Sequence, residues 1–130
     1  MTTELKSPQQ QIYDAVFIKS LNLTDNTYMY LPDGNAGYPF VYVGEQFDQD
    51  IANKSTVAGN VQQTLHIYGT VKQRRQVSTL VNNLKRDLRT INHTENFNVT
   101  VKGIDGQIIL DNSTSTNLLH GIVEVEFSFN

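Results

Sequence analysis

The sequence predicts an α+β fold, a single domain in which two helices pack on a mainly antiparallel sheet. Two segments carry apolar residues at helical spacing, and several others alternate apolar and polar residues as strands do. The chain has 130 residues, of which 38% are hydrophobic, and this suits one domain with a buried core. We expect a flexible arm over residues 1–6 and one folded domain over residues 7–130.

The first helix is predicted over residues 8–21. Ser7 is a suitable N-cap, Pro8 fits the first helical position, and Gln10 completes a Ser-x-x-Gln capping box. The apolar side chains that follow at helical spacing define one face of this helix: Ile12, Tyr13, Val16, Phe17 and Leu21.

Three strands are expected between the helices. Residues 27–31 form a short one, and the β-branched and aromatic run of residues 40–47 predicts a strong one. Residues 61–68 form the third, with Leu65 on one face and His66 on the other.

The second helix is the clearest element, and Asn92 and His93 end it. Its apolar side chains form a single stripe: Val77, Leu80, Val81, Leu84, Leu88 and Ile91. Basic residues gather on its other side and flanks: Lys72, Arg74, Arg75, Lys85, Arg86 and Arg89. These are six of the ten basic residues in a chain of net charge -3, so the remainder of the chain is acidic.

The C-terminal part is predicted to form three strands. Residues 97–101 and 107–110 flank a turn over residues 103–106, which contains the Asp-Gly hairpin signal. A polar linker over residues 111–117 leads to the last strand, residues 121–129, which alternates apolar residues with Glu and Ser. This alternation is typical of a half-buried antiparallel strand with one wet face.

The residues that could carry chemistry show no catalytic or metal-ligand spacing. His66, His93 and His120 could converge on a metal, or each could be a partly exposed, hydrogen-bonded histidine. There is no cysteine, no Gly-x-Ser-x-Gly nucleophile elbow and no phosphate-binding glycine loop. We therefore predict no catalytic residue, no cofactor and no metal site, and a protein that is not an enzyme.

Charge and hydropathy exclude two further classes. An acidic net charge argues against a free-standing DNA-binding protein. No apolar run approaches the roughly 18–20 residues of a membrane span, and the N-terminus lacks the apolar region of a signal peptide. We expect the chain to be made and used in a cytosol-like compartment.

Two segments are candidate interfaces. The polar stretch of residues 48–60 is long for a connection between strands, and long loops often bind partners. The basic helix face could be merely solvated, could contact nucleic acid, or could contact an acidic neighbouring subunit; the acidic remainder of the chain favours the last. The candidate interface residues are Asp48, Asp50, Lys54, Arg74, Arg75, Lys85, Arg86 and Arg89.

The order of motifs resembles a family of small proteins of long-tailed bacteriophages (siphophages): the tail-completion, tail-terminator and tail-to-head joining proteins. The resemblance covers residues 7–129. It is carried by Tyr28-x-Tyr30-Leu31-Pro32, by Tyr38-Pro39-Phe40-Val41-Tyr42-Val43-Gly44-Glu45, by Leu65-His66-Ile67-Tyr68 before an amphipathic helix, and by the closing Leu119-His120-Gly121-Ile122-Val123-Glu124-Val125-Glu126-Phe127.

This resemblance implies a structural virion protein made in the bacterial host cytoplasm. Such proteins form a ring, usually a hexamer, at the head-proximal end of the tail, where they terminate the tail tube. The implied partners are other copies of the chain, the head connector or stopper protein and the major tail tube protein. DNA passes through the lumen without specific binding, no membrane is involved, and no catalytic residues are carried over.

Two other functions stay open from the residues alone. One is a monomeric α+β domain that binds a small ligand or a protein without catalysis, with a pocket between sheet and helices that Tyr28, Tyr30, Tyr42 and Tyr68 would line. The other is a hydrolase or nuclease that uses a histidine together with an acid.

Overall fold

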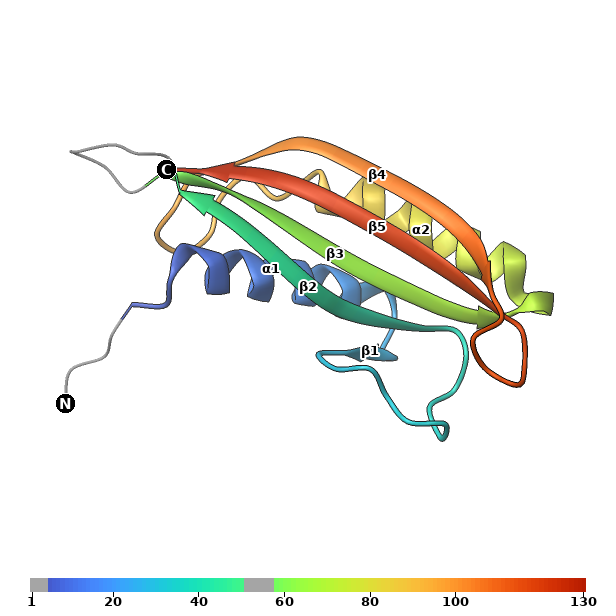
Figure 1. Cartoon of the computed structure of the whole chain (residues 1–130). Helices are drawn as coiled ribbons and strands as arrows, with labels where there is room; N and C mark the ends of the chain where they lie inside the picture. Colours follow the sequence, from blue (N-terminus) through green and yellow to red (C-terminus); the bar gives the residue numbers. More distant parts are fainter. Residues whose placement is uncertain (1–4, 51–57) are drawn as a thin grey trace.

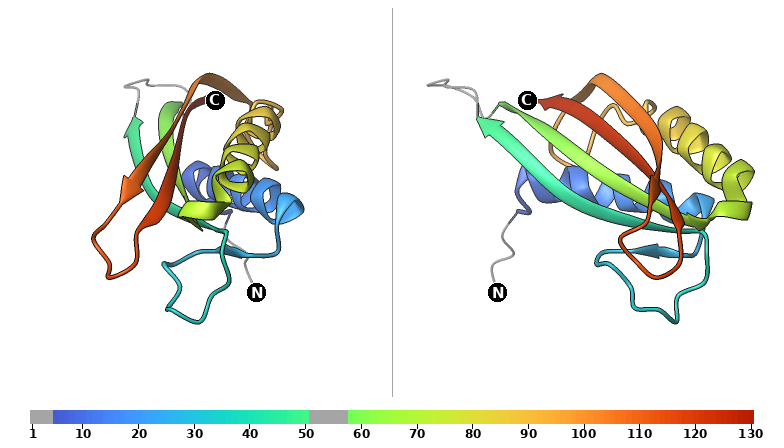
Figure 2. Two further views of the ribbon diagram at one scale, coloured as in Figure 1. Left: turned by 90° about the vertical axis from the view of Figure 1, so that its right-hand side faces the viewer. Right: turned by 45° about the vertical axis from the view of Figure 1, so that its right-hand side comes forward.

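Two helices cover one face of a five-stranded sheet, and both lie on the same side of it (Figures 1 and 2). The computed structural model describes residues 5–50 and 58–130. Its elements are α1 (Pro8–Leu23), β1 (Thr27–Tyr28), β2 (Phe40–Asp50), β3 (Gly59–Thr70), a 3₁₀ turn (Val71–Gln73), α2 (Arg74–Leu88), β4 (Val99–Asp111) and β5 (Leu118–Phe129). The predicted α+β class is confirmed.

The sheet is built around two long antiparallel strands. The strand order is β1-β2-β3-β5-β4, and only the short β1 runs parallel to its neighbour. β3 and β5 pair over their whole lengths, from Gly59 opposite Phe129 to Thr70 opposite Leu118. Because side chains alternate along a strand, this register sends one complete set to the helices and the other set to the open face.

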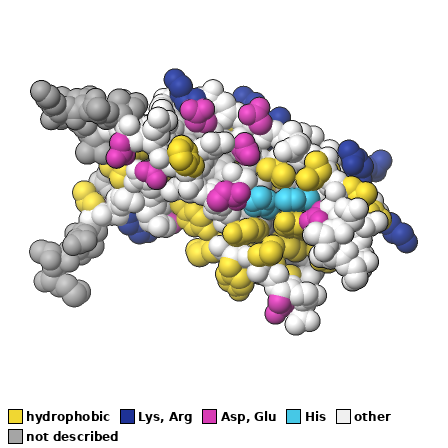
Figure 3. Space-filling view, viewed as in Figure 1, with side chains coloured by type: hydrophobic (Ala, Val, Ile, Leu, Met, Phe, Trp, Pro, Cys, Tyr) yellow, Lys and Arg dark blue, Asp and Glu magenta, His cyan; other side chains and the backbone are white. Residues whose placement is uncertain are grey.

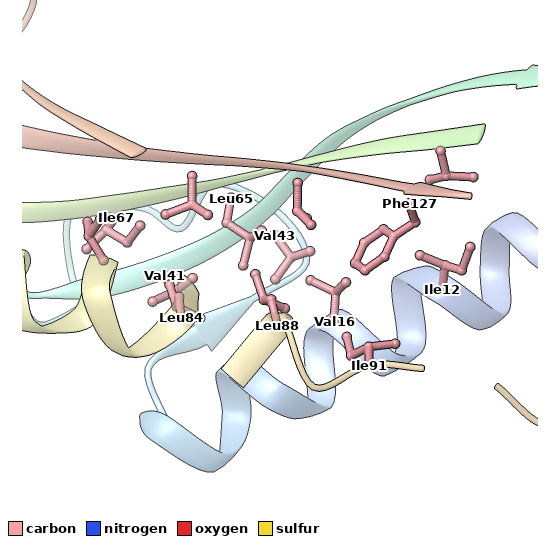
Figure 4. Packing of buried hydrophobic residues seen from close by; sticks show 14 of the residues in the cluster. Ile12, Val16, Val41, Val43, Leu65, Ile67, Leu84, Leu88, Ile91 and Phe127 are labelled. Carbon is pink, nitrogen blue, oxygen red and sulfur yellow. The ribbon is translucent and has the colours of Figure 1, made fainter. Parts of the chain in front are cut away.

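The core lies between the helices and the sheet (Figure 4). α1 contributes Ile12 and Val16, and α2 contributes Leu84 and Leu88. The sheet side chains that meet them are all fully buried or nearly so: Val41, Val43, Val61, Leu65, Ile67, Val123, Val125 and Phe127. Each such aliphatic or aromatic side chain stabilises the fold by about 1.5–3 kcal/mol.

The start of α1 matches the predicted cap in part. The backbone N–H of Gln10 donates to Ser7 Oγ at 3.1 Å, as a capping serine requires. The Gln10 side chain does not return to the cap; it donates to Asp14 Oδ1, one helical turn further on. α1 therefore begins where predicted and runs two residues longer, to Leu23.

The predicted hairpin within the fourth strand is wrong. Residues 99–111 form one continuous strand, β4, which pairs with β5 throughout and contains a bulge between Val101 and Gly103. Asp105 and Gly106 lie opposite Glu124 and Val123 in the ladder instead of forming a turn. The glycine serves close packing: a Cβ at position 106 would lie 3.1 Å from Cγ1 of Val81 on α2.

Other predicted boundaries also move: β4 begins at Val99 instead of residue 97, and β5 begins at Leu118 instead of residue 121. The strand expected over residues 27–31 covers only Thr27–Tyr28, and α2 ends at Leu88, although Ile91 beyond it is still buried. The expected loop over residues 48–60 is also too long: β2 continues to Asp50 and β3 begins at Gly59, because these residues pair with each other across the ladder. Residues 51–57 and the arm residues 1–4 lie outside the described part of the chain.

The close contact of α2 with the sheet gives a stability prediction. A Cβ at Gly69 would lie 2.5 Å from the buried Cγ2 of Val77, so Gly69→Ala forces the helix from the sheet. We expect a loss of about 1–3 kcal/mol in the free energy of unfolding, measured with urea. Gly103→Ala is the matched control, because no atom lies within 4 Å of its Cβ. Equal stabilities of the two variants would contradict the packing described for α2.

Candidate functional site

Aromatic and histidine side chains form a connected group on the open face of the sheet. The ring of Phe40 on β2 lies 5.4 Å from that of Tyr68 on β3, and Tyr68 stacks on His120 of β5 at 4.4 Å. His120 in turn lies 4.9 Å from His66, which stacks on Tyr42 at 5.6 Å. We call these five residues the aromatic–histidine cluster.

The cluster includes a short chain of hydrogen bonds. His66 Nε2 lies 2.6 Å from Glu45 Oε1, and His66 Nδ1 lies 2.7 Å from His120 Nε2. The His66 side chain is 15% exposed and that of Glu45 is 69% exposed, so these hydrogen bonds lead from solvent into the sheet face.

A β-bulge places Glu45 in this chain. Between Val43 and Gln46 the register of β2 against β3 shifts, which leaves Gly44 and Glu45 opposite one residue. The buried Gln63 stabilises the bulge, because its Nε2 donates to the carbonyl oxygens of Gly44 and Glu45 at 3.0 and 3.1 Å. Gly44 also leaves room for the imidazole, since a Cβ there would lie 2.9 Å from His66 Cδ2.

The hydrogen bonds among Glu45, His66 and His120 do not accommodate two imidazolium rings at once. The hydrogen bond from His66 lowers the pKa of the Glu45 carboxyl, which therefore accepts as a carboxylate. Burial lowers the pKa of His120, and the neighbouring His66 lowers it further. When Glu45 accepts a hydrogen bond from His66 Nε2, His66 Nδ1 either donates to His120 Nε2 or accepts from it. If both rings were imidazolium ions, two N–H donors would face each other with no acceptor between them.

Within the described residues, the arrangement provides an acid–histidine pair, and the groups beside it are as follows. In residues 5–50 and 58–130, no three His, Asp or Glu side chains are placed to hold a metal ion. Within the same residues no serine or threonine hydroxyl is hydrogen-bonded to either imidazole. His93 is separate from the cluster: it is exposed, and its Nδ1 lies 2.7 Å from the Oδ1 of the adjacent Asn92.

Apolar residues and a cavity adjoin the cluster. The tyrosines expected to line a pocket between sheet and helices lie instead on the open face, where Tyr28 packs on Tyr30 and Phe40. A cavity of about 270 Å³ opens beside Tyr68, and Asp33 and Asp111 stand among its lining residues. A larger hollow of about 380 Å³ lies at the other end of the sheet and does not include the cluster.

Figure 3 shows the charge distribution on this open face. Histidines lie near its middle with hydrophobic side chains beside them, carboxylates surround them, and lysine and arginine appear mainly at the edges. The carboxylates that the strand register and the cavity place here are Asp33, Glu45, Asp105, Asp111, Glu124 and Glu126.

The predicted interface residues lie in two separate places. The basic residues of α2 are on the helix layer, and Arg74, Arg75, Arg86 and Arg89 are exposed while Lys85 is half-buried. Arg86 donates to Asp87 and Asn83 on its own helix.

Asp48 and Asp50 are exposed at the far end of β2, where Gln9 Nε2 of α1 donates to Asp48 at 3.3 Å. Lys54 lies outside the described residues. The structure therefore does not bring the two candidate groups together.

Sequence reasoning missed Glu45, and it treated His66 and His120 as separate. Alternation correctly placed His66 on the face opposite to Leu65, whereas His120 lay outside the strand predicted over residues 121–129, which begins at Leu118. The pairing of Tyr68 with His120 depends on the register of β3 against β5, and the 51 residues between them in the sequence do not reveal that register. The Gly44-Glu45 dipeptide inside a strong strand was the available signal for a bulge.

The fold is similar to that of solved structures. A chain in the structure titled "Virion of native gene transfer agent (GTA) particle" matches with a TM-score of 0.62 over 95% of this chain and 96% of that chain, at 8% sequence identity. A second solved structure matches with a TM-score of 0.57 over 95% and 97%, at 11% identity. At such identities the likeness concerns the fold.

No protein-family model matches the sequence, and no curated protein matches it either. Neither helix of the described residues is long and apolar enough to span a membrane.

The lowered pKa of His120 predicts a pH-dependent stability. As the pH falls from about 7.5 to about 5.5, the unfolded chain protonates His120 near its ordinary pKa of 6.5, whereas the folded chain resists this. The free energy of unfolding of the wild-type chain therefore decreases as the pH is lowered through this window. The same decrease should be smaller for His120→Gln.

Urea unfolding at three pH values measures this effect. His93→Gln is the control, since that imidazole is exposed and outside the cluster, and it should leave the pH slope of the wild-type chain unchanged. Identical slopes for His120→Gln and the wild-type chain would show that the cluster does not restrict protonation.

Proposed function

We propose that this chain is a structural protein of a phage-like virion. The observation that carries this proposal is the fold match to a chain of a gene transfer agent virion, which spans nearly all of both chains. Two chains that share a fold over nearly their whole lengths are reasonable candidates for the same kind of assembly role. The motif order that resembles phage tail-completion proteins supports the same proposal.

Within the virion, we place the chain in a ring at the head-proximal end of the tail, where it terminates the tail tube and joins it to the head connector. Copies of the chain, the connector or stopper and the tail tube protein are its proposed partners. An acidic chain suits a passage for DNA, because carboxylates repel phosphates and allow sliding.

The proposed contacts keep both groups of candidate residues. Asp48 and Asp50 lie at the β2–β3 end of the subunit and, with Lys54 that follows them in the sequence, would contact an adjoining ring. The bases of α2 would contact an acidic neighbour. The role requires no catalysis. If replacing His66, His93 and His120 leaves particle assembly intact, the hydrolase alternative loses its only candidate residues.

Removal of the chain from its particle-producing system tests the proposal. Negative-stain images should show overlong tails if the chain terminates the tube, or full heads separate from normal-length tails if it only joins the two. Complementation with the wild-type chain should restore complete particles. Normal particles in its absence would contradict the proposed role.

A further inference from the structure

The two layers of the fold carry opposite charge. Four bases of α2 and Arg89 at its C-terminal end lie on the helix layer, and six carboxylates lie on or beside the open sheet face. Within residues 5–50 and 58–130, none of these six carboxylates forms an ion pair with a lysine or arginine, and of the α2 bases only Arg86 is ion-paired. Both surfaces are therefore available for an external partner of the opposite charge.

The open face also offers the apolar contacts that a basic side chain needs. Tyr30, Leu31 and Ile109 are exposed by 44–67% of their surface at the margins of the aromatic–histidine cluster. Aromatic rings and carboxylates together bind ammonium and guanidinium groups, the rings by cation–π attraction and the carboxylates by charged hydrogen bonds. The cavity between Asp33, Asp111 and the ring of Tyr68 has both kinds of group.

We propose that the basic face of α2 in one copy of this chain docks on the acidic open sheet face of the next copy. This inference rests on the proposed ring and specifies the surfaces that build it. A symmetric contact would press acidic face on acidic face, or basic on basic, and like charges at an interface are costly. Only a head-to-tail contact pairs the two surfaces, and head-to-tail contacts that close by rotation form rings.

Charge reversal tests the contact. Arg74→Glu/Arg75→Glu/Arg89→Glu makes the α2 face acidic, because four acids, Asp87 included, then stand against Lys85 and Arg86. Asp105→Lys/Asp111→Lys/Glu124→Lys/Glu126→Lys makes the open face basic, because four lysines then stand against Asp33 and Glu45. Each variant alone should lose the self-association of the wild-type chain, because its two faces now carry the same sign. Arg74 and Arg75 stand in the first turn of α2, where acidic side chains favour the helix, and Arg89 lies beyond its last residue, so a folding defect is not expected.

Mixing the two variants gives the sharpest outcome. The acidic open face of the α2 variant pairs with the basic α2 of the open-face variant. The acidic α2 of the first variant likewise pairs with the basic open face of the second. An equimolar mixture should therefore form oligomers of alternating subunits. Native mass spectrometry at low ionic strength should find equal numbers of both variants in complexes larger than two subunits. Raising the salt from about 50 to about 500 mM should weaken association at least about tenfold.

A control and three outcomes delimit the inference. Asp25→Lys/Glu95→Lys also makes the chain more basic, but in exposed turns instead of on the open face, and should associate like the wild-type chain. Association of each reversed variant alone would overturn the inference and leave the proposed function standing. A mixture that stops at two subunits would overturn the head-to-tail arrangement. A wild-type chain that stays monomeric at low salt would also overturn it, while the removal experiment still decides the proposed function.

Discussion

The antiparallel pairing of β3 with β5 over twelve residues fixes what each face of the sheet presents. Its register directs Leu65 and Val123 to the helices and, by the same alternation, His66 to the opposite face. A shift by one residue would exchange the two sets, bury the histidines and expose the core. The close packing of α2 on Gly69 then holds the helix layer on its side of the sheet.

The separation of the faces extends to charge. Bases collect on α2 because its apolar stripe turns inward and leaves them outside, while acids alternate with the buried valines of β5. On the open face the bulge at Gly44-Glu45 turns a carboxylate toward His66, and burial lowers the pKa of His120. One subunit thus offers two complementary surfaces, which is what a repeating assembly with identical contacts requires.

Much of this fold could be predicted from local patterns, and the errors have identifiable causes. The residue spacing that a helix or strand imposes by itself was enough to predict three features. These are the Ser7 cap, the apolar stripe of α2 and the alternation of buried and exposed residues along the last strand. The Asp105-Gly106 turn failed because β5 supplies a full-length partner, and tertiary pairing outweighs a local turn preference. The Glu45–His66–His120 chain depends on long-range register and a bulge, which no local pattern in one sequence determines.

Cysteine cross-linking between the two faces tests the central claim most directly, because the natural chain contains no cysteine. Thr79→Cys on α2 and Gln107→Cys on the open face are both exposed positions. In the assembled protein, the doubly substituted chain treated with a short bis-maleimide should give a ladder of covalent oligomers that ends at a closed ring. Each single variant should give no ladder. Cross-links that join only two subunits, or join equivalent positions, would contradict the account.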